Sequence, residues 1–254
     1  MNRVLKGVRT CMARGAVDDA ATLLLHLWSE EPATPGLRET SVELADRFPL
    51  SESAAEVLRC ATVTSAERDW LPAAVELAKR EVGVRRARCQ ADPTPESLSG
   101  HVAALDVLAS VQRALGEEDT AAAFLAEVVE WQYDHGDRAG VAWALRELAV
   151  LAIGAGDLDR AVTRLTRAAS LYREQPDDPA MRSACGECRV LLACVRWAQN
   201  RPAEARELLE AALAEFRDDD AAVDVLRLLE ALDSGDDLPE SVPLGGEFGQ
   251  LSWV

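Results

Sequence analysis

The cysteine pair in Cys185-Gly-Glu-Cys188 is the motif of this chain with the clearest chemical potential. Two thiols at this spacing can bind a metal ion or exchange disulfides. A structural zinc site needs four ligands, and the sequence supplies neither a second cysteine pair nor a nearby histidine. A redox pair of this type follows a strand in a βαβ unit, whereas the pattern here is helical. We therefore expect a structural role in the first turns of a helix, with one cysteine buried and no metal or cofactor.

The other residues that could do chemistry are isolated. His26, His101 and His135 lie far apart, and none has a nucleophile or a metal-binding partner beside it. Gly245-Gly246 is not flanked by the strand and helix that a phosphate-binding loop requires. Acidic pairs such as Asp18-Asp19 stand at expected helix starts, where they complement the helix dipole. The sequence thus predicts no catalytic residue, and we do not expect an enzyme.

One segment concentrates positive charge within a helical pattern. Because Glu76 and Glu81 are interleaved with its basic residues, we interpret it as a solvated face or as an intramolecular partner of the acidic C-terminus, rather than as an RNA contact. The basic residues are Lys79, Arg80, Arg85, Arg86 and Arg88.

The composition limits the classes of partner. The chain has 254 residues and a formal net charge of −17, so it repels phosphate backbones and nucleic acid is not an expected partner. It has no apolar run of about 18 residues, and we expect no membrane span. The apolar stretch from Ala20 to Leu27 is too short for a signal peptide and contains His26. Six cysteines without a framework spacing favour a reduced, cytoplasmic protein.

The elements that must position these residues are helices, because helical periodicity runs through most of the chain. Gly15, Gly116 and Gly156 are suited to the left-handed conformation that ends a helix. Ser51 and Asp157 are expected N-caps. The predicted helices cover 2–14, 17–31, 37–48, 51–66, 70–90, 96–115, 117–134, 138–154, 157–174, 180–199, 202–216 and 219–232.

A small residue recurs shortly after a turn residue between consecutive helices. Such an alanine lets two antiparallel helices cross closely. The five occurrences are Gly15 to Ala20, Asp69 to Ala73, Gly116 to Ala121, Gly156 to Ala161 and Asn200 to Ala205.

These positions resemble the tetratricopeptide repeat (TPR) family, whose small and apolar residues recur in a helix–turn–helix unit. The strongest match is Leu145, Leu148, Ala149, Ala152, Gly156-Asp157-Leu158, Ala161, Leu165 and Ala168. The repeats are longer than the usual period of about 34 residues, as in the TPR-like sensor domains of bacterial regulators. Two registers are compatible with the first half: residues 35–68 form a degenerate repeat and leave 70–90 unpaired, or Ala73 marks the repeat and 37–48 is an inserted helix.

The resemblance implies an all-α fold, an α-solenoid of antiparallel helix pairs in a right-handed superhelix with about 12 helices. We expect it to span residues 1–232, with degenerate repeats in 1–100, clear repeats in 101–216 and a capping helix in 217–232. Residues 233–254, which are acidic and contain Pro and Gly, are expected to form a flexible tail.

The resemblance also implies a concave groove lined by the first helix of each repeat. The chaperone-binding members of the family clamp a carboxylate with Lys and Asn, and this chain has neither at the corresponding positions. The residues carried over to the groove are Arg9, Met12, Asp106, Ser110, Arg113, Trp143, Arg146, Val150, Glu187, Val190, Cys194 and Trp197. For Trp143 and Trp197, packing on a neighbouring helix is the alternative.

We therefore expect a non-catalytic adaptor or regulatory module, bacterial and cytoplasmic, that binds a protein or peptide segment in this groove. The alternative is a small-molecule-binding or accessory enzyme role in a biosynthetic pathway, with the site inside the solenoid. Two further hypotheses are a homodimer and a contact between the groove and the tail residues Phe248 and Trp253.

Overall fold

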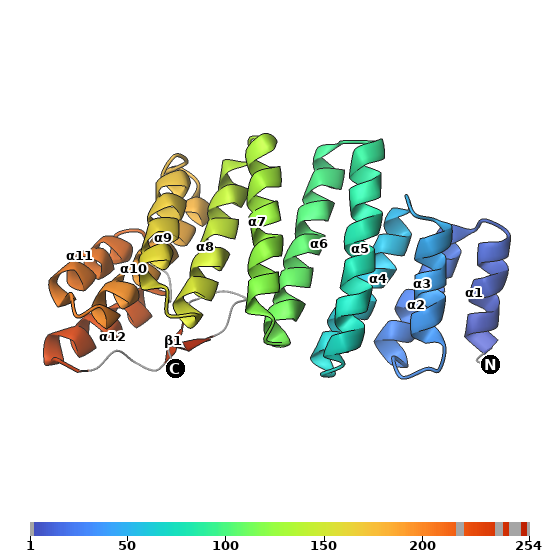
Figure 1. The fold of residues 1–254 in the computed structure, drawn as a ribbon, viewed down its shortest axis with the longest axis horizontal. Coiled ribbons are helices and arrows are strands. Elements are labelled where there is room, and N and C mark those ends of the chain that lie inside the picture. The colour runs from blue at the N-terminus through green and yellow to red at the C-terminus, as the bar shows by residue number, and fades with distance from the viewer. Residues whose placement is uncertain (1–2, 217–220, 237–240, 244–249, 253–254) are drawn as a thin grey trace. The chain divides into compact units, whose positions relative to one another are not determined.

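The computed structural model describes residues 3–216, 221–236, 241–243 and 250–252. Their main elements are helices, which run one after another along the chain (Figure 1). The helices are α1 (Arg3–Ala13), α2 (Val17–Glu30), α3 (Leu37–Arg47), α4 (Glu52–Glu67), α5 (Leu71–Ala91), α6 (Pro95–Ala114), α7 (Glu118–Asp134), α8 (Arg138–Gly154), α9 (Leu158–Tyr172), α10 (Pro179–Ala198), α11 (Pro202–Leu213) and α12 (Ala221–Ser234). Each corresponds to a predicted helix, so the predicted all-α fold with about 12 helices is confirmed.

The chain divides into two compact units, Met1–Phe124 and Leu125–Val254, and the boundary falls within α7. In unit 1, α4 packs against α5 and α5 packs against α6, while α3 lies against α2 and α4. Helix α5 is therefore paired rather than left alone. Of the two predicted registers, the structure favours the one in which α4 and α5 form the repeat and α3 is inserted.

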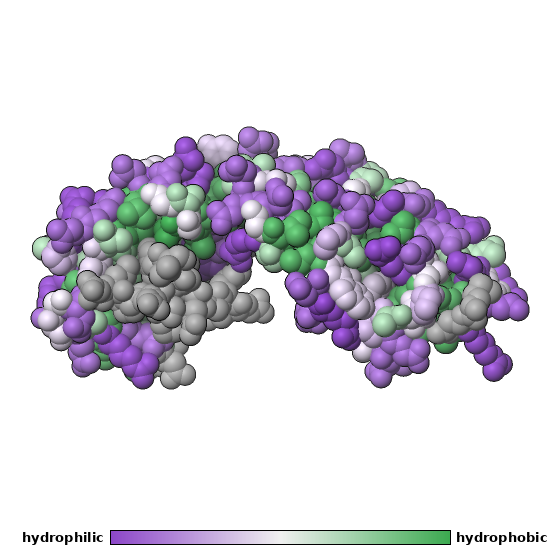
Figure 2. Space-filling view, turned by 60° about the horizontal axis from the view of Figure 1, so that its bottom comes forward, coloured by the Kyte–Doolittle hydropathy of each residue, from purple (hydrophilic) through white to green (hydrophobic). Residues whose placement is uncertain are grey.

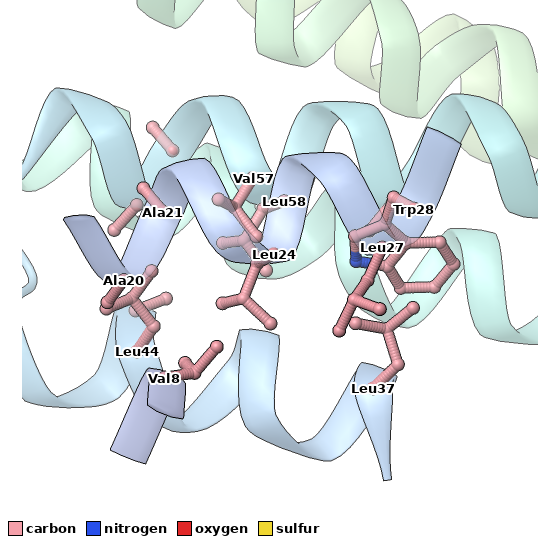
Figure 3. Packing of buried hydrophobic residues seen from close by; sticks show 14 of the residues in the cluster. Val8, Ala20, Ala21, Leu24, Leu27, Trp28, Leu37, Leu44, Val57 and Leu58 are labelled. Carbon is pink, nitrogen blue, oxygen red and sulfur yellow. The ribbon is translucent and has the colours of Figure 1, made fainter. Parts of the chain in front are cut away.

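The core of unit 1 is built around α2. Leu24 of this helix belongs to one buried cluster with Val8 from α1, Leu44 from α3 and Leu58 from α4 (Figure 3). These four side chains are at most 1% exposed. Burial of a leucine side chain contributes about 1.5–3 kcal/mol, so this cluster holds four helices together.

The same turn connects six pairs of consecutive helices. The turn residue has a positive φ, between 59° and 81°. The amide of the next residue donates a hydrogen bond of 2.8–3.0 Å to the carbonyl five residues earlier, which is the Schellman arrangement. Four of the turn residues are glycines, and two are an aspartate and an asparagine that adopt the conformation without a glycine. The six are Gly15, Asp69, Gly116, Gly136, Gly156 and Asn200.

The buried small residue follows this turn residue at a fixed distance of five positions. Ala20, Ala161 and Ala205 are 0% exposed and Ala121 is 1% exposed. After Asp69 the buried residue is Ala74, which is 0% exposed, whereas the predicted Ala73 is half-buried. The prediction of Ala73 was wrong by one residue, because the spacing of five positions from Asp69 reaches Ala74.

In unit 2, consecutive helices from α8 to α12 pack against one another. Helix α12 places Val225 and Leu228 on a cluster that contains Leu209 of α11 and Val190 of α10. The helix therefore packs on the last helix pair, and the capping role expected for 217–232 stays a prediction.

Part of the expected tail has regular structure. Strands β1 (Ser241–Pro243) and β2 (Gln250–Ser252) form a short antiparallel pair, an element that the sequence did not predict. Phe248 and Trp253, the residues of the tail-in-groove hypothesis, lie outside the described residues.

The described surface is mainly hydrophilic in the view of Figure 2. Hydrophobic residues are visible in smaller areas between the hydrophilic ones. Among the described helices, none combines the length and the apolar character that crossing a bilayer requires.

Candidate functional site

The predicted groove residues of α8 and α10 each follow one stripe along their helix, and on α10 only the first part of the stripe is open. On α10, Glu187 is half-buried, whereas Val190 and Cys194 are 3% and 1% exposed. Both belong to the cluster formed with α11 and α12. Val190 and Cys194 therefore cannot line a groove, and that prediction was wrong because the C-terminal helices cover this part of the stripe.

Two further residues of the prediction have packing contacts. Val150 of α8 packs on the core of α8, α9 and α10, and Trp197 packs on the cluster beneath α12. For Trp197 the structure thus shows the alternative of packing on neighbouring helices.

The predicted residues of unit 1 differ in exposure. Met12 is 1% exposed in the core of α1–α4, so its assignment to the groove was wrong. Arg9 and Arg113 are exposed, and Asp106 and Ser110 are half-buried on α6. Arg9 lies 3.7 Å from Glu43. A groove that joins these residues to α8 and α10 stays a prediction.

The structure brings three of the predicted residues into one pocket, which we call the α8–α10 pocket. Trp143, Arg146 and Glu187 line it together with Tyr172 from the end of α9 and Met181 from α10. The pocket is open to solvent and has a volume of about 480 Å³. Small residues complete the wall of the pocket and leave room for a ligand: Ala139, Gly140, Ala180, Ser183 and Ala184.

Arg146 is the buried charge of this pocket. The residue is 8% exposed, and its Nε and Nη2 atoms both lie 3.2 Å from Oε1 of Glu147. Its Nη1 atom forms an ion pair with Oε2 of Glu187. Burial lowers the pKa of Arg146, but the carboxylates of Glu147 and Glu187 raise the pKa by more, so the guanidinium stays charged.

The groups beneath Arg146 are neutral. Burial raises the pKa of the Tyr172 hydroxyl well above its ordinary value, and the opposing effect of Arg146 is smaller. Burial raises the pKa of the Cys188 thiol in the same way. The charged residues that line the pocket are consequently Arg146 and Glu187, and the carboxylate of Glu147 lies behind Arg146.

The cysteine motif is part of the core under this pocket. Cys185 and Cys188 are 1% and 0% exposed, and the Cys185 thiol points to the carbonyl of Ala169 at 3.7 Å. Burial raises the pKa of both thiols, which disfavours the thiolate that metal binding and disulfide exchange need. Among the described residues, no group of His, Cys, Asp and Glu is arranged to hold a metal ion. Both cysteines are thus packing residues, where one buried cysteine was predicted.

Gly186, inside the same motif, is required by close packing. A Cβ atom at this position would lie 2.7–3.0 Å from three ring carbons of Phe216, which is 4% exposed. We predict that Gly186→Ala lowers the free energy of unfolding by about 1–2 kcal/mol, since overpacking outweighs the better helix propensity of alanine. Urea unfolding of the variant measures this. Gly83→Ala is the control, because a Cβ there meets nothing within 4 Å and the change is expected to be stabilising. A stabilised Gly186→Ala variant would contradict the prediction.

The basic segment of α5 forms ion pairs within unit 1. Arg85 is 5% exposed and contacts Glu81 on its own helix and Glu52 and Glu56 on α4. Arg80 contacts Asp46 at 2.5 Å. The ion-pair partners of Arg80 and Arg85 therefore lie on α3, α4 and α5, and a contact of this segment with the acidic C-terminus stays a prediction.

The three histidines have different environments. His101 on α6 is 0% exposed, and burial together with the nearby Arg86 lowers its pKa to about 4. It is therefore neutral at physiological pH. His135 stacks on the ring of Trp131 at 5.3 Å, and His26 is exposed.

Comparison with solved structures identifies the fold. No family model and no curated protein matches the sequence. Among solved structures, the chain is similar to BtubC (BKLC) from P. vanneervenii, with 17% identity, a TM-score of 0.58 and coverage of 84% of this chain and 87% of that one. It is also similar to a putative kinesin light chain with nearly identical TPR-like repeats from Podosopora anserina, with 20% identity, a TM-score of 0.54 and coverage of 84% and 92%. The chain has a TPR-like fold.

A third structure agrees with this TPR-like fold. The apo form of RapI has 12% identity and a TM-score of 0.61, and the match covers 90% of this chain and 63% of that one. In the TPR-like arrangement, α8 with α9 and α10 with α11 are the helix pairs, and the turns at Gly156 and Asn200 join their members. Trp143, Arg146 and Glu187 accordingly stand on the first helix of successive pairs.

Sequence reasoning missed Tyr172 and Met181 as pocket residues. Tyr172 is in the last turn of α9, the second helix of its pair, where its position matches the core pattern of that helix. Met181 is in the first turn of α10, seven residues before Cys188, and the groove positions carried over from the family begin later in this helix.

Proposed function

We propose that this protein is a non-catalytic binding module that holds a segment of a partner protein in the α8–α10 pocket. The observation that carries the proposal is the convergence of Trp143, Arg146 and Glu187, from two successive helix pairs, on one open pocket of about 480 Å³. Tryptophan and arginine are the residue types that most often anchor protein interfaces. The long repeats and the six free cysteines further support a bacterial, cytoplasmic regulatory adaptor.

The chemistry of the pocket supports binding rather than catalysis. Burial keeps the hydroxyl of Tyr172 and the thiol of Cys188, in the core under the pocket, protonated. Arg146 engages the carboxylates of Glu187, in the pocket wall, and of Glu147, behind it. Trp143 and Met181 instead offer a large apolar contact area to a side chain that enters the pocket.

Replacing Trp143 by alanine tests the binding role. Proteins captured by the wild-type chain from a lysate of its source cells should bind Trp143→Ala at least tenfold more weakly, because a central aromatic anchor contributes about 2 kcal/mol or more. Trp70→Ala is the matched control, since Trp70 is a 40% exposed tryptophan of unit 1 and should not affect capture. Helicity should be unchanged in both variants. Equal capture by Trp143→Ala would show that the pocket is not the binding site.

The size of the pocket favours one second candidate, the binding of a small molecule. A volume of about 480 Å³ lies within the range of about 300–1,000 Å³ that is typical of small-molecule sites. A metabolite that raises the melting temperature of the wild type but not of Trp143→Ala, without any captured protein, would support this alternative.

A further inference from the structure

We propose that the α8–α10 pocket receives a positively charged side chain, an arginine or a lysine, from the segment that it binds. This inference rests on the proposed binding role and specifies its chemistry. It also changes the role expected of Arg146. The sequence suggests Arg146 as an anchor for the partner, whereas the structure assigns that role to Glu187 and Trp143.

The charges of the pocket favour a cation. Arg146 is set against the two carboxylates of Glu147 and Glu187, which leaves one negative charge in excess. Glu147 is 6% exposed behind Arg146, and the Glu187 side chain is 19% exposed and lines the pocket. The formal net charge of the chain, −17, adds a field of the same sign. A cationic group is therefore attracted both at long range and at the site.

An anionic ligand meets an obstacle at the same place. All three nitrogen atoms of the Arg146 guanidinium contact carboxylates, through Nε and Nη2 to Glu147 and Nη1 to Glu187. An anion would have to displace one of these carboxylates, and an unpaired carboxylate in a buried position is costly. A carboxylate, in contrast, accepts up to about four hydrogen bonds, so Glu187 can accept from Arg146 and from a guest together.

The other residues that line the pocket suit both the methylene groups and the charged end of a basic side chain. Trp143 offers an aromatic ring, and a guanidinium or ammonium over such a ring gains about 0.5–2 kcal/mol from the cation–π interaction. Met181 and the alanines at 139, 180 and 184 provide apolar surface for the methylene groups that carry the charge. Glu187 can then accept hydrogen bonds from the charged end.

The three methionines of the chain provide a direct test. Protein labelled with 13C at the methionine methyl groups is titrated with the peptides acetyl-Ala-X-Ala-amide, where X is arginine, lysine, norleucine or glutamate. Met181 lines the pocket and Met12, buried in unit 1, is the internal reference. We expect the Met181 signal to shift with the arginine and lysine peptides, at least fivefold more weakly with norleucine, and not with glutamate. Raising the salt concentration should weaken the response.

Two charge-matched variants locate the effect. Glu187→Gln keeps an acceptor for Arg146 but removes the negative charge, and it should weaken binding of the arginine peptide at least fivefold. Glu207→Gln, at an exposed position of α11, makes the same change in net charge and should have no effect. If the melting temperature of Glu187→Gln equals that of the wild type, the weaker peptide binding is not caused by a loss of folding.

The possible outcomes separate this inference from the proposed function. If the norleucine or glutamate peptide shifts Met181 as strongly as the arginine peptide, or if Glu187→Gln binds like the wild type, the preference for a cation is wrong and the binding role stands. If no peptide shifts Met181, the cation preference is also wrong. The proposed function is then decided by the capture experiment with Trp143→Ala alone.

Discussion

Replacing Arg85 by alanine is expected to lower the free energy of unfolding of unit 1 by about 3 kcal/mol, because it breaks a buried ion pair by removing one partner. Glu81 is 0% exposed, and its Oε1 atom accepts hydrogen bonds from Nε of Arg85 at 2.9 Å and Nε of Arg59 at 2.8 Å. Without Arg85, the Glu81 carboxylate keeps only Arg59 in a site from which water is excluded. Urea unfolding followed by circular dichroism measures the loss.

Two further variants make this prediction specific. Arg80 lies on the same helix as Arg85 and forms an exposed ion pair with Asp46 of α3. Arg80→Ala removes this pair and is expected to lower the free energy of unfolding by about 0.5 kcal/mol or less. The double variant Arg85→Met/Glu81→Leu removes both buried charges and is expected to recover most of the lost stability, since apolar residues of similar volume replace a buried pair at little cost. A loss in Arg85→Ala no larger than that in Arg80→Ala would contradict the assigned role of the pair.

The network around Arg85 also shows what periodicity cannot predict. The spacing of Glu81 and Arg85, four residues on one helix, is visible in the sequence. Glu52 and Glu56, the partners on α4, are 33 and 29 residues away, and their proximity depends on the packing of α4 against α5. The sequence indicated that α5 is charged, but its ion-pair partners depend on the packing of α5 against α4.

The helices themselves were predictable because local signals agree with the tertiary packing. The positive-φ turn recurs at six positions, four of which carry glycine, and a buried alanine follows five positions later at five of the six. The error at Ala73 arose after Asp69, where two alanines follow one another and the sequence does not show which of them is buried. The spacing of five positions that the other turns share selects Ala74.

The candidate site was predictable only in part, for a geometric reason. The stripe through Trp143 and Arg146 on α8 and through Glu187 on α10 was identified from the repeat positions, and these residues line the pocket. The continuation of the α10 stripe through Val190 and Cys194 is covered by α11 and α12. Positions within a repeat do not reveal how much of the first helix the following helices cover, because this depends on the repeat's place in the chain.

Replacing Arg146 by alanine distinguishes a residue that holds the pocket together from one that contacts the partner. We expect the free energy of unfolding of unit 2 to fall by about 2–3 kcal/mol, because the change leaves the carboxylates of Glu147 and Glu187 without their shared guanidinium. An anchor that contacts only the partner would lose binding with little loss of stability. Urea unfolding is the measurement, and Arg138→Ala is the control on the same helix, with a 62% exposed side chain and an expected cost of about 0.5 kcal/mol or less.

A second change in the Arg146→Ala background tests the cause of the loss. Glu147→Gln removes the more deeply buried carboxylate, so the double variant is expected to be more stable than Arg146→Ala alone. If the second change instead adds to the loss, the buried carboxylate is not the source of the instability. Arg146→Lys should lie between the wild type and Arg146→Ala, because an ammonium keeps the charge but cannot reproduce the fork that reaches Glu147 and Glu187 at once. A stable Arg146→Ala variant with lost partner binding would return Arg146 to the role of a direct anchor.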